Sequence, residues 1–151
     1  MRSVKKQIQH LDIHIISFLK KVEIPAVRIA IFTVYFWFGM LKLIGASPAT
    51  PLVHSLFEQT IHFMPFSTFY TLFAVFEMVI GILFLIPKME RVAILLLGLH
   101  LITTMLPLLV LPNTTWQGFL IPTLEGQYII KNVLIIAAAI VIGARVVPMK
   151  R

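Results

Sequence analysis

The chain has 151 residues, 59% of them hydrophobic, and a formal net charge of +7. Soluble domains use about 45–50% apolar residues, so this composition excludes an ordinary water-soluble domain and indicates a membrane protein. The chain contains no cysteine, which excludes disulfide exchange, thiolate metal sites and iron–sulfur clusters.

The predicted fold is an all-α polytopic membrane protein, a single bundle of four transmembrane helices. A spanning helix needs roughly 20 apolar residues to cross a hydrocarbon core about 30 Å thick. Without water in that core, each backbone group must find its partner within its own segment, as it does in a helix. In chain order we expect a surface helix over 4–22, a spanning helix over 24–44, a short interfacial helix over 51–64, and spanning helices over 66–87, 92–111 and 126–147.

Two of these segments are expected to lie on the membrane surface. In 4–22, apolar residues recur at helical spacing beside lysines, which predicts an amphipathic helix on the cytoplasmic surface. In 51–64, an apolar stripe follows Thr50-Pro51, a pair that resembles an N-cap and a first-turn proline. This second helix is expected on the outer side, with Pro65 ending it.

The basic residues indicate a topology rather than a nucleic-acid partner. If the chain crosses four times, ten of them share one side, and Lys42 and Lys131 fall toward the other. The positive-inside rule then places both termini in the cytoplasm, and membrane lipid is the expected partner. The ten are Arg2, Lys5, Lys6, Lys20, Lys21, Lys88, Arg91, Arg145, Lys150 and Arg151.

The candidate site consists of polar residues within the spanning helices. Ionisable groups there cost a few kcal/mol on insertion scales, so they usually face a bundle interior or a cavity. Since Cβ bonds tilt toward the helix N-terminus, we expect Lys42, Glu77 and Lys131 to converge in the outer half and form a net positive pocket. The expected ligand-binding residues are Lys42, Glu77, His100, Lys131 and Asn132, with Arg28 secondary.

Five of these residues also have a structural interpretation. Lys42 and Lys131 would extend separately to the outer headgroups. Glu77 would form a structural ion pair with one of the lysines, and His100 would be a hydrogen-bonded packing residue. Arg28, about one turn inside the inner boundary, would reach a lipid phosphate.

No metal or haem site is expected. His54, Glu58 and His62 share one helix face, but the outer pair would lie about 12 Å apart along an ideal helix, too far for one metal ion. His100 is the single histidine at membrane depth, so a bis-histidine haem site would need another chain. The residues themselves indicate no cofactor.

An ordered set of segments resembles a known family. Arg28 opens the first spanning helix and FWFGMLK closes it at 36–42; FEMVIG lies at 76–81 and EGQYIIKN at 125–132. Together they resemble the DoxX-like family of small four-helix bacterial membrane proteins, especially the branch containing the reactive-chlorine resistance membrane protein. The resemblance covers about residues 24–147. It implies the bacterial cytoplasmic membrane, oxidative stress and a quinone as ligand.

Three functions remain open at this point, and with them whether the protein is an enzyme. The first is a redox-associated protein that binds a quinone or small anion at Lys42 and Lys131, with Glu77 and His100 handling protons. The second is a non-enzymatic binding or transport bundle for a lipid or small anion, which would need a homo-oligomer because it has no internal repeat. The third is an accessory subunit whose buried charges are satisfied by a partner membrane protein.

Overall fold

The computed structural model describes residues 2–148, which are mostly helical. Within that part of the chain, four segments are long and apolar enough to cross a membrane: Gln7–Leu43, Phe66–Leu85, Glu90–Val110 and Leu124–Gly143. Many side chains on the outside of these segments are large, apolar and exposed, among them Leu95, Ile102 and Leu134. Soluble proteins rarely expose apolar surface on this scale. The expected bundle of four helices of spanning length is therefore confirmed in its architecture.

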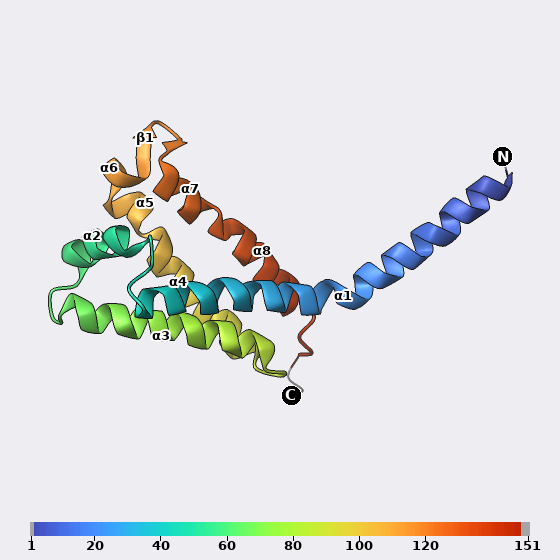
Figure 1. Cartoon of the computed structure of the whole chain (residues 1–151), viewed down its shortest axis with the longest axis horizontal. Helices are drawn as coiled ribbons and strands as arrows, with labels where there is room; N and C mark the ends of the chain where they lie inside the picture. Colours follow the sequence, from blue (N-terminus) through green and yellow to red (C-terminus); the bar gives the residue numbers. More distant parts are fainter. Residues whose placement is uncertain (1, 149–151) are drawn as a thin grey trace.

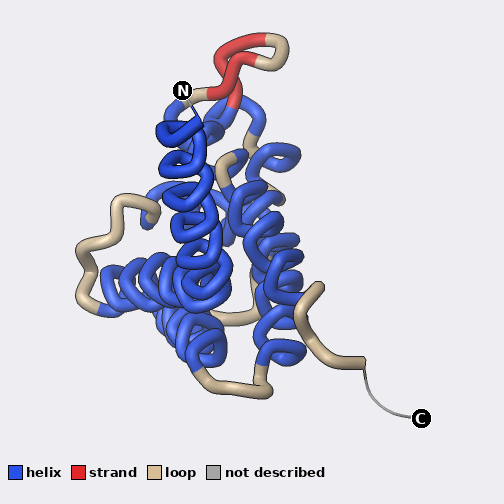
Figure 2. The backbone as a smooth tube through the Cα atoms, turned by 90° about the vertical axis from the view of Figure 1, so that its right-hand side faces the viewer, coloured by secondary structure: helices blue, strands red, loops and turns tan. Residues whose placement is uncertain are grey.

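Two short strands add a feature that the sequence did not predict. In chain order the elements are α1 (Arg2–Leu43), α2 (Thr50–Thr60), α3 (Phe66–Leu85), α4 (Glu90–Met105), α5 (Pro107–Val110), α6 (Pro112–Thr115), β1 (Trp116–Gly118), β2 (Ile121–Pro122), α7 (Leu124–Ile130) and α8 (Asn132–Gly143). The strands pair antiparallel as a hairpin that projects beyond the helices (Figure 2). This hairpin lies in the expected outer loop, so the fold is all-α except at this point.

The expected surface helix over 4–22 and the first spanning helix over 24–44 form one continuous helix, α1. Pro25 lies inside it. A proline removes one backbone hydrogen bond and bends a helix without necessarily ending it. Figure 1 shows α1 bending near its label, with its N-terminal part leading away from the bundle. The side chains from Gln7 to Lys21 are exposed, so the bundle does not cover this part of α1.

Prolines and a threonine cap explain the other shifted boundaries. The expected helix over 51–64 ends at Thr60, and Pro65 disfavours a helical conformation at the residue before it. Pro107 separates α4 from α5 because it has no N–H to continue the ladder. The Thr123 hydroxyl accepts a hydrogen bond from the Gly126 N–H, so α7 begins before the expected position 126.

The fourth spanning segment is shorter than expected at its other end. It is interrupted at Lys131, between α7 and α8, and α8 ends at Gly143 rather than at residue 147. Glycine has a low helix propensity, so Gly143 is a natural place for the helix to stop.

The closest helix pair is α1 with α3, and two glycines permit the close approach. A Cβ on Gly39 would lie 2.7 Å from the Ala74 carbonyl oxygen, and one on Gly81 would lie 3.0 Å from the Phe36 backbone nitrogen. Small residues let helix backbones meet closely in membrane proteins. The ring of contacts is completed by α4 against α3 and α8, and by α8 against α1.

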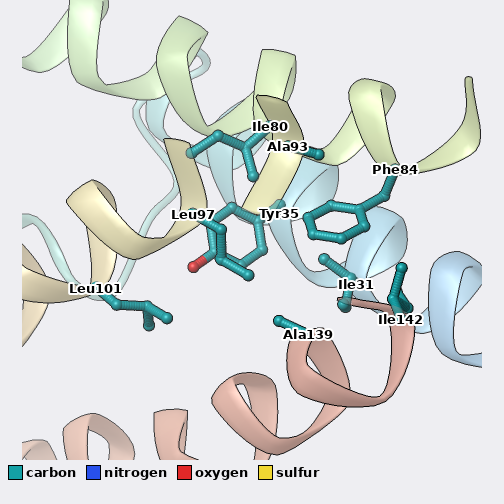
Figure 3. Packing of buried hydrophobic residues seen from close by; sticks show 9 residues of the cluster. All are labelled: Ile31, Tyr35, Ile80, Phe84, Ala93, Leu97, Leu101, Ala139 and Ile142. Atoms are coloured by element: carbon teal, nitrogen blue, oxygen red, sulfur yellow. The ribbon is translucent and has the colours of Figure 1, made fainter. Parts of the chain in front are cut away.

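One end of the bundle holds the hydrophobic core, and we call it the narrow end. Phe84, Ile80 and Ala93 are fully buried there. Figure 3 shows the cluster, which consists of Ile31, Tyr35, Ile80, Phe84, Ala93, Leu97, Leu101, Ala139 and Ile142. The opposite end, which carries α2, α5, α6 and α7, is the wide end, and Figure 1 shows α7 diverging from α1 toward it.

Candidate functional site

Four buried side chains form a continuous hydrogen-bonded chain between three helices. The Lys42 ammonium on α1 donates to Glu77 Oε2 on α3 over 2.6 Å. Glu77 Oε1 lies 3.0 Å from His100 Nε2 on α4, and His100 Nδ1 lies 3.2 Å from the Tyr35 hydroxyl on α1. Each of the four residues is at most 7% exposed. We call Tyr35, Lys42, Glu77 and His100 the buried polar chain.

Within the buried polar chain, each polar group has a hydrogen-bond partner although it is shielded from solvent. A buried carboxylate needs partners on both oxygens, and Glu77 has Lys42 on one and His100 on the other. A carboxylate offers no proton, so the Nε2 that faces it carries the hydrogen. In a neutral imidazole Nδ1 then accepts from the Tyr35 hydroxyl. With a neutral His100, the charges of Lys42 and Glu77 cancel.

Aromatic rings hold the His100 imidazole in place. The Phe73 ring is stacked on it with centroids 5.0 Å apart and planes 18° from parallel. The Tyr35 ring meets it edge-on, with centroids 5.1 Å apart. Lys42 Nζ lies 5.7 Å from the Phe73 ring centroid, within the range of a cation–π contact. These contacts fix the orientation of the imidazole.

A cavity of about 700 Å³ at the wide end is lined by all four residues of the buried polar chain. Ligand pockets typically have volumes of about 300–1,000 Å³ and mostly apolar walls with a few polar groups. Here the apolar wall comes from α1, α2, α3, α4 and α7. The cavity therefore has the size and composition of a small-molecule site with one polar wall.

Helix α2 lies across the wide end and lines the cavity with one face (Figure 1). Its first residue, Thr50, shares a 2.6 Å hydrogen bond with the Tyr70 hydroxyl on α3. Its buried Phe57 packs against the rings of Phe66 and Phe69, with centroids 5.4 and 5.1 Å away. The interfacial helix expected from the sequence is thus fixed to α3 as part of the cavity wall.

Lys131 does not join the buried polar chain, so the expected convergence is wrong for this residue. Lys131 is exposed, and its Nζ lies 5.1 Å from the Tyr128 ring centroid. The face of α7 and α8 that lines the cavity carries Glu125, Tyr128 and Asn132 at helical spacing, and position 131 lies off this face. Asn132 lines the cavity as expected. The net positive pocket is lost with Lys131.

Arg28 has a protein partner where a lipid phosphate was expected. Its guanidinium forms an ion pair with Glu90, the first residue of α4, and both side chains are less than 20% exposed. A second ion pair joins Arg145 to Glu23. Both lie at the narrow end, away from the cavity. Glu90 fell outside the expected helix over 92–111, so sequence reasoning did not pair it with Arg28.

Sequence reasoning missed Tyr35 and Phe73, the cavity residues that contact the His100 ring, although a signal existed for both. Tyr35 precedes Lys42 by seven residues, and Phe73 precedes Glu77 by four. Residues at these spacings share a helix face. An aromatic residue on the same face as a buried charge was therefore identifiable, but apolar spanning helices contain many aromatic residues.

The structure offers no metal centre within residues 2–148, where no three potential histidine or carboxylate ligands converge. His54 Nδ1 lies 3.6 Å from Glu58 Oε1, and both side chains are largely exposed.

Comparison of the chain with models of known families, with curated proteins and with solved structures finds no match.

Proposed function

We propose that the four long helices span a membrane and that the wide-end cavity binds a quinone. The observation that carries the proposal is the buried polar chain on one wall of an otherwise apolar cavity. A quinone is a flat ring with two hydrogen-bond acceptors and a hydrophobic substituent. Lys42 has three N–H donors and uses one on Glu77, so the wall retains donors for a carbonyl oxygen.

The charge balance favours a neutral ligand over a small anion. The anion hypothesis depended on two lysines facing one carboxylate. With Lys131 exposed, Lys42 faces Glu77 alone, and the pair is neutral as a unit. A small anion would lose its hydration in this apolar cavity without a net positive charge to replace it.

The accessory-subunit hypothesis receives less support. It expected the buried charges to remain unsatisfied until a partner membrane protein supplied the missing groups. Glu77 instead has partners from α1 and α4 of the same chain. The alternative is a non-enzymatic bundle that holds a lipid in the same cavity, and a binding experiment must distinguish it from quinone binding.

We infer a redox setting from the resemblance to DoxX-like proteins, which include members linked to oxidative stress. Reduction of a quinone to a quinol takes up two electrons and two protons. Glu77 and His100 line the cavity and are suitable groups to exchange those protons. The electrons would come from a second substrate or a partner protein, since the chain has no thiols.

The proposed orientation has both termini in the cytoplasm. The described basic residues that support it include Lys88 and Arg91, beside the turn between α3 and α4, and Arg145 after α8; Lys150 and Arg151 lie outside the described residues. Reporter fusions at residue 151 and within 112–125 should report opposite sides of the membrane. The same side for both would contradict four crossings.

Quinone binding is tested directly with the full chain in lipid nanodiscs. We expect a benzoquinone with a decyl tail to bind saturably at one molecule per chain. The Lys42→Met variant should bind at least about tenfold more weakly, because it loses the donor and unbalances Glu77. Lys131→Met is the matched control and should bind like the wild type.

Two results would count against the proposal. If well-folded wild-type protein shows no saturable quinone binding, the quinone assignment is wrong. If the cavity instead retains a phospholipid or fatty acid that the decyl quinone does not displace, the non-enzymatic lipid-binding function is the better account.

A further inference from the structure

Two of the side chains at which the cavity meets the molecular surface lie on α1 and α7. Phe38 on α1 and Tyr128 on α7 both line the cavity, yet they are 54% and 64% exposed. A residue that lines a cavity while more than half exposed marks an opening.

The opening follows from two helix faces that diverge. Val34, Phe38 and Leu41 lie at i, i+4 and i+7 on α1, and all three line the cavity. Across from them is the face of α7 and α8 with Tyr128 and Asn132. At the narrow end α1 and α8 are joined through the core cluster. Figure 1 shows α7 leaving α1 toward the wide end, so the two faces separate there.

The opposite side, between α3 and α4, is more obstructed. Leu99 on α4 lines the cavity and is 53% exposed. However, Phe73 stacks on His100 there, and Phe69 stacks on Phe73 with centroids 5.6 Å apart. Phe76 adds a third ring, 6.1 Å from the His100 ring. These rings form an aromatic wall across that side.

Large apolar side chains are exposed on the helices beside the opening between α1 and α7. Two charged groups also lie near it: Lys131 Nζ is 5.1 Å from the Tyr128 ring centroid, and Glu125, one turn before Tyr128, is exposed. Trp37 on α1 is 57% exposed, and Val133 and Leu134 on α8 are 55% and 72% exposed. In a spanning bundle, side chains of this kind face hydrocarbon rather than water. An opening flanked by them leads to lipid.

We propose that the ligand enters the cavity sideways from the bilayer, between α1 and α7, and that its apolar tail rests between Phe38 and Tyr128. The inference rests on the proposed quinone function and extends it, because it assigns a path and requires a ligand with a single hydrophobic tail. The ring would lie against the buried polar chain while the tail remains in contact with lipid. Through their contact with the tail, Phe38 and Tyr128 would favour ligands with a hydrophobic tail over ligands without one.

The absence of cysteine gives a clean test, since one introduced thiol is the single labelling site. Phe38→Cys and, separately, Tyr128→Cys are labelled with a bulky maleimide in nanodiscs. Trp37→Cys, next to Phe38, equally exposed and not lining the cavity, is the matched control. The probes are the decyl benzoquinone and the same ring with a methyl group in place of the decyl tail.

We expect the label at 38 or 128 to weaken decyl-quinone binding at least tenfold and methyl-quinone binding less than threefold. The label at 37 should change neither, and each labelled variant is compared with its own unlabelled form. If the wild type binds the decyl quinone and the labels at 38 and 128 leave the binding of the labelled variants unchanged, this inference alone is overturned. A block produced instead by a label on Leu99→Cys, or on Thr60→Cys at the α2 side, also overturns it alone. Failure of the wild type to bind either quinone overturns the proposed function as well.

Discussion

The two ends of the bundle differ in packing: the narrow end is filled by apolar side chains, and the wide end encloses a cavity. At the narrow end, Phe84, Ile80 and Ala93 have no exposed surface, and apolar side chains from four helices meet directly. At the wide end, α7 diverges from α1 and a cavity of about 700 Å³ lies between the helices. Protein interiors rarely contain voids much larger than a water molecule. The helices around this cavity therefore make fewer packing contacts than those at the narrow end.

The difference indicates where stability and function are located. At the narrow end the core cluster holds α1, α3, α4 and α8 together. The glycine-mediated contact of α1 and α3 continues to the level of the cavity, where Gly39 lies against Ala74. The polar residues follow the same division. Arg28 and Glu90 link α1 to α4 at the narrow end, whereas Lys42, Glu77 and His100 face the cavity. Mutations at the two ends should therefore affect different measurements.

The largest expected effect is at the narrow end. Phe84→Ala removes a fully buried ring and should lower the free energy of unfolding by about 3–5 kcal/mol. Unfolding in mixed micelles with increasing denaturing detergent measures this. Leu85→Ala, a neighbouring side chain that is 41% exposed, is the control, with an expected change within about 0.5 kcal/mol. Equal effects would show that the narrow end is not the stabilising core.

Removal of the central carboxylate should be the next largest effect. Glu77→Gln leaves Lys42 buried without its counter-charge and weakens the bond to His100, at a cost of about 3 kcal/mol. Lys42→Ala should cost less, about 1–3 kcal/mol, because Glu77 keeps His100 as a partner. The same unfolding assay compares the two variants. If Lys42→Ala is the more damaging, the carboxylate is not the centre of the buried polar chain.

A smaller effect is expected where α2 is fixed to α3. Tyr70→Phe removes the hydroxyl that bonds to Thr50 and should cost about 1 kcal/mol of stability. Because α2 lines the cavity, quinone binding should weaken by a few fold. Unfolding and binding measured on the same preparation test this. An unchanged affinity would show that α2 covers the cavity without shaping it.

The helices were predictable because hydrophobicity over about 20 residues is a local signal. Their exact ends were less so: Pro25 bends α1 without ending it, whereas Pro107 separates α4 from α5. The same residue type thus has two outcomes, and the tertiary setting decides between them.

The site was predictable in part. The convergence of Lys42 with Glu77 followed from helix direction and depth, which depend on the sequence alone, but the sequence left open which lysine pairs with Glu77. The same argument was wrong for Lys131 because depth says nothing about rotation around the helix axis. Tyr128 on α7 and Asn132 on α8 line the cavity instead. The role of Tyr35 depends on the position of His100, 65 residues away, which a local pattern cannot give.

The most direct test of the central claim is the quinone affinity of Tyr35→Phe, because this variant keeps the buried ring and deletes the hydroxyl at the end of the buried polar chain. Without that hydroxyl, His100 Nδ1 loses its partner and the polar wall loses one of its hydrogen-bonding groups, while Glu77 still faces the Nε2 hydrogen. We predict about tenfold weaker decyl-quinone binding with a loss of unfolding free energy near 1 kcal/mol. Unchanged affinity in a folded variant would contradict the assignment of the polar wall as the ligand site.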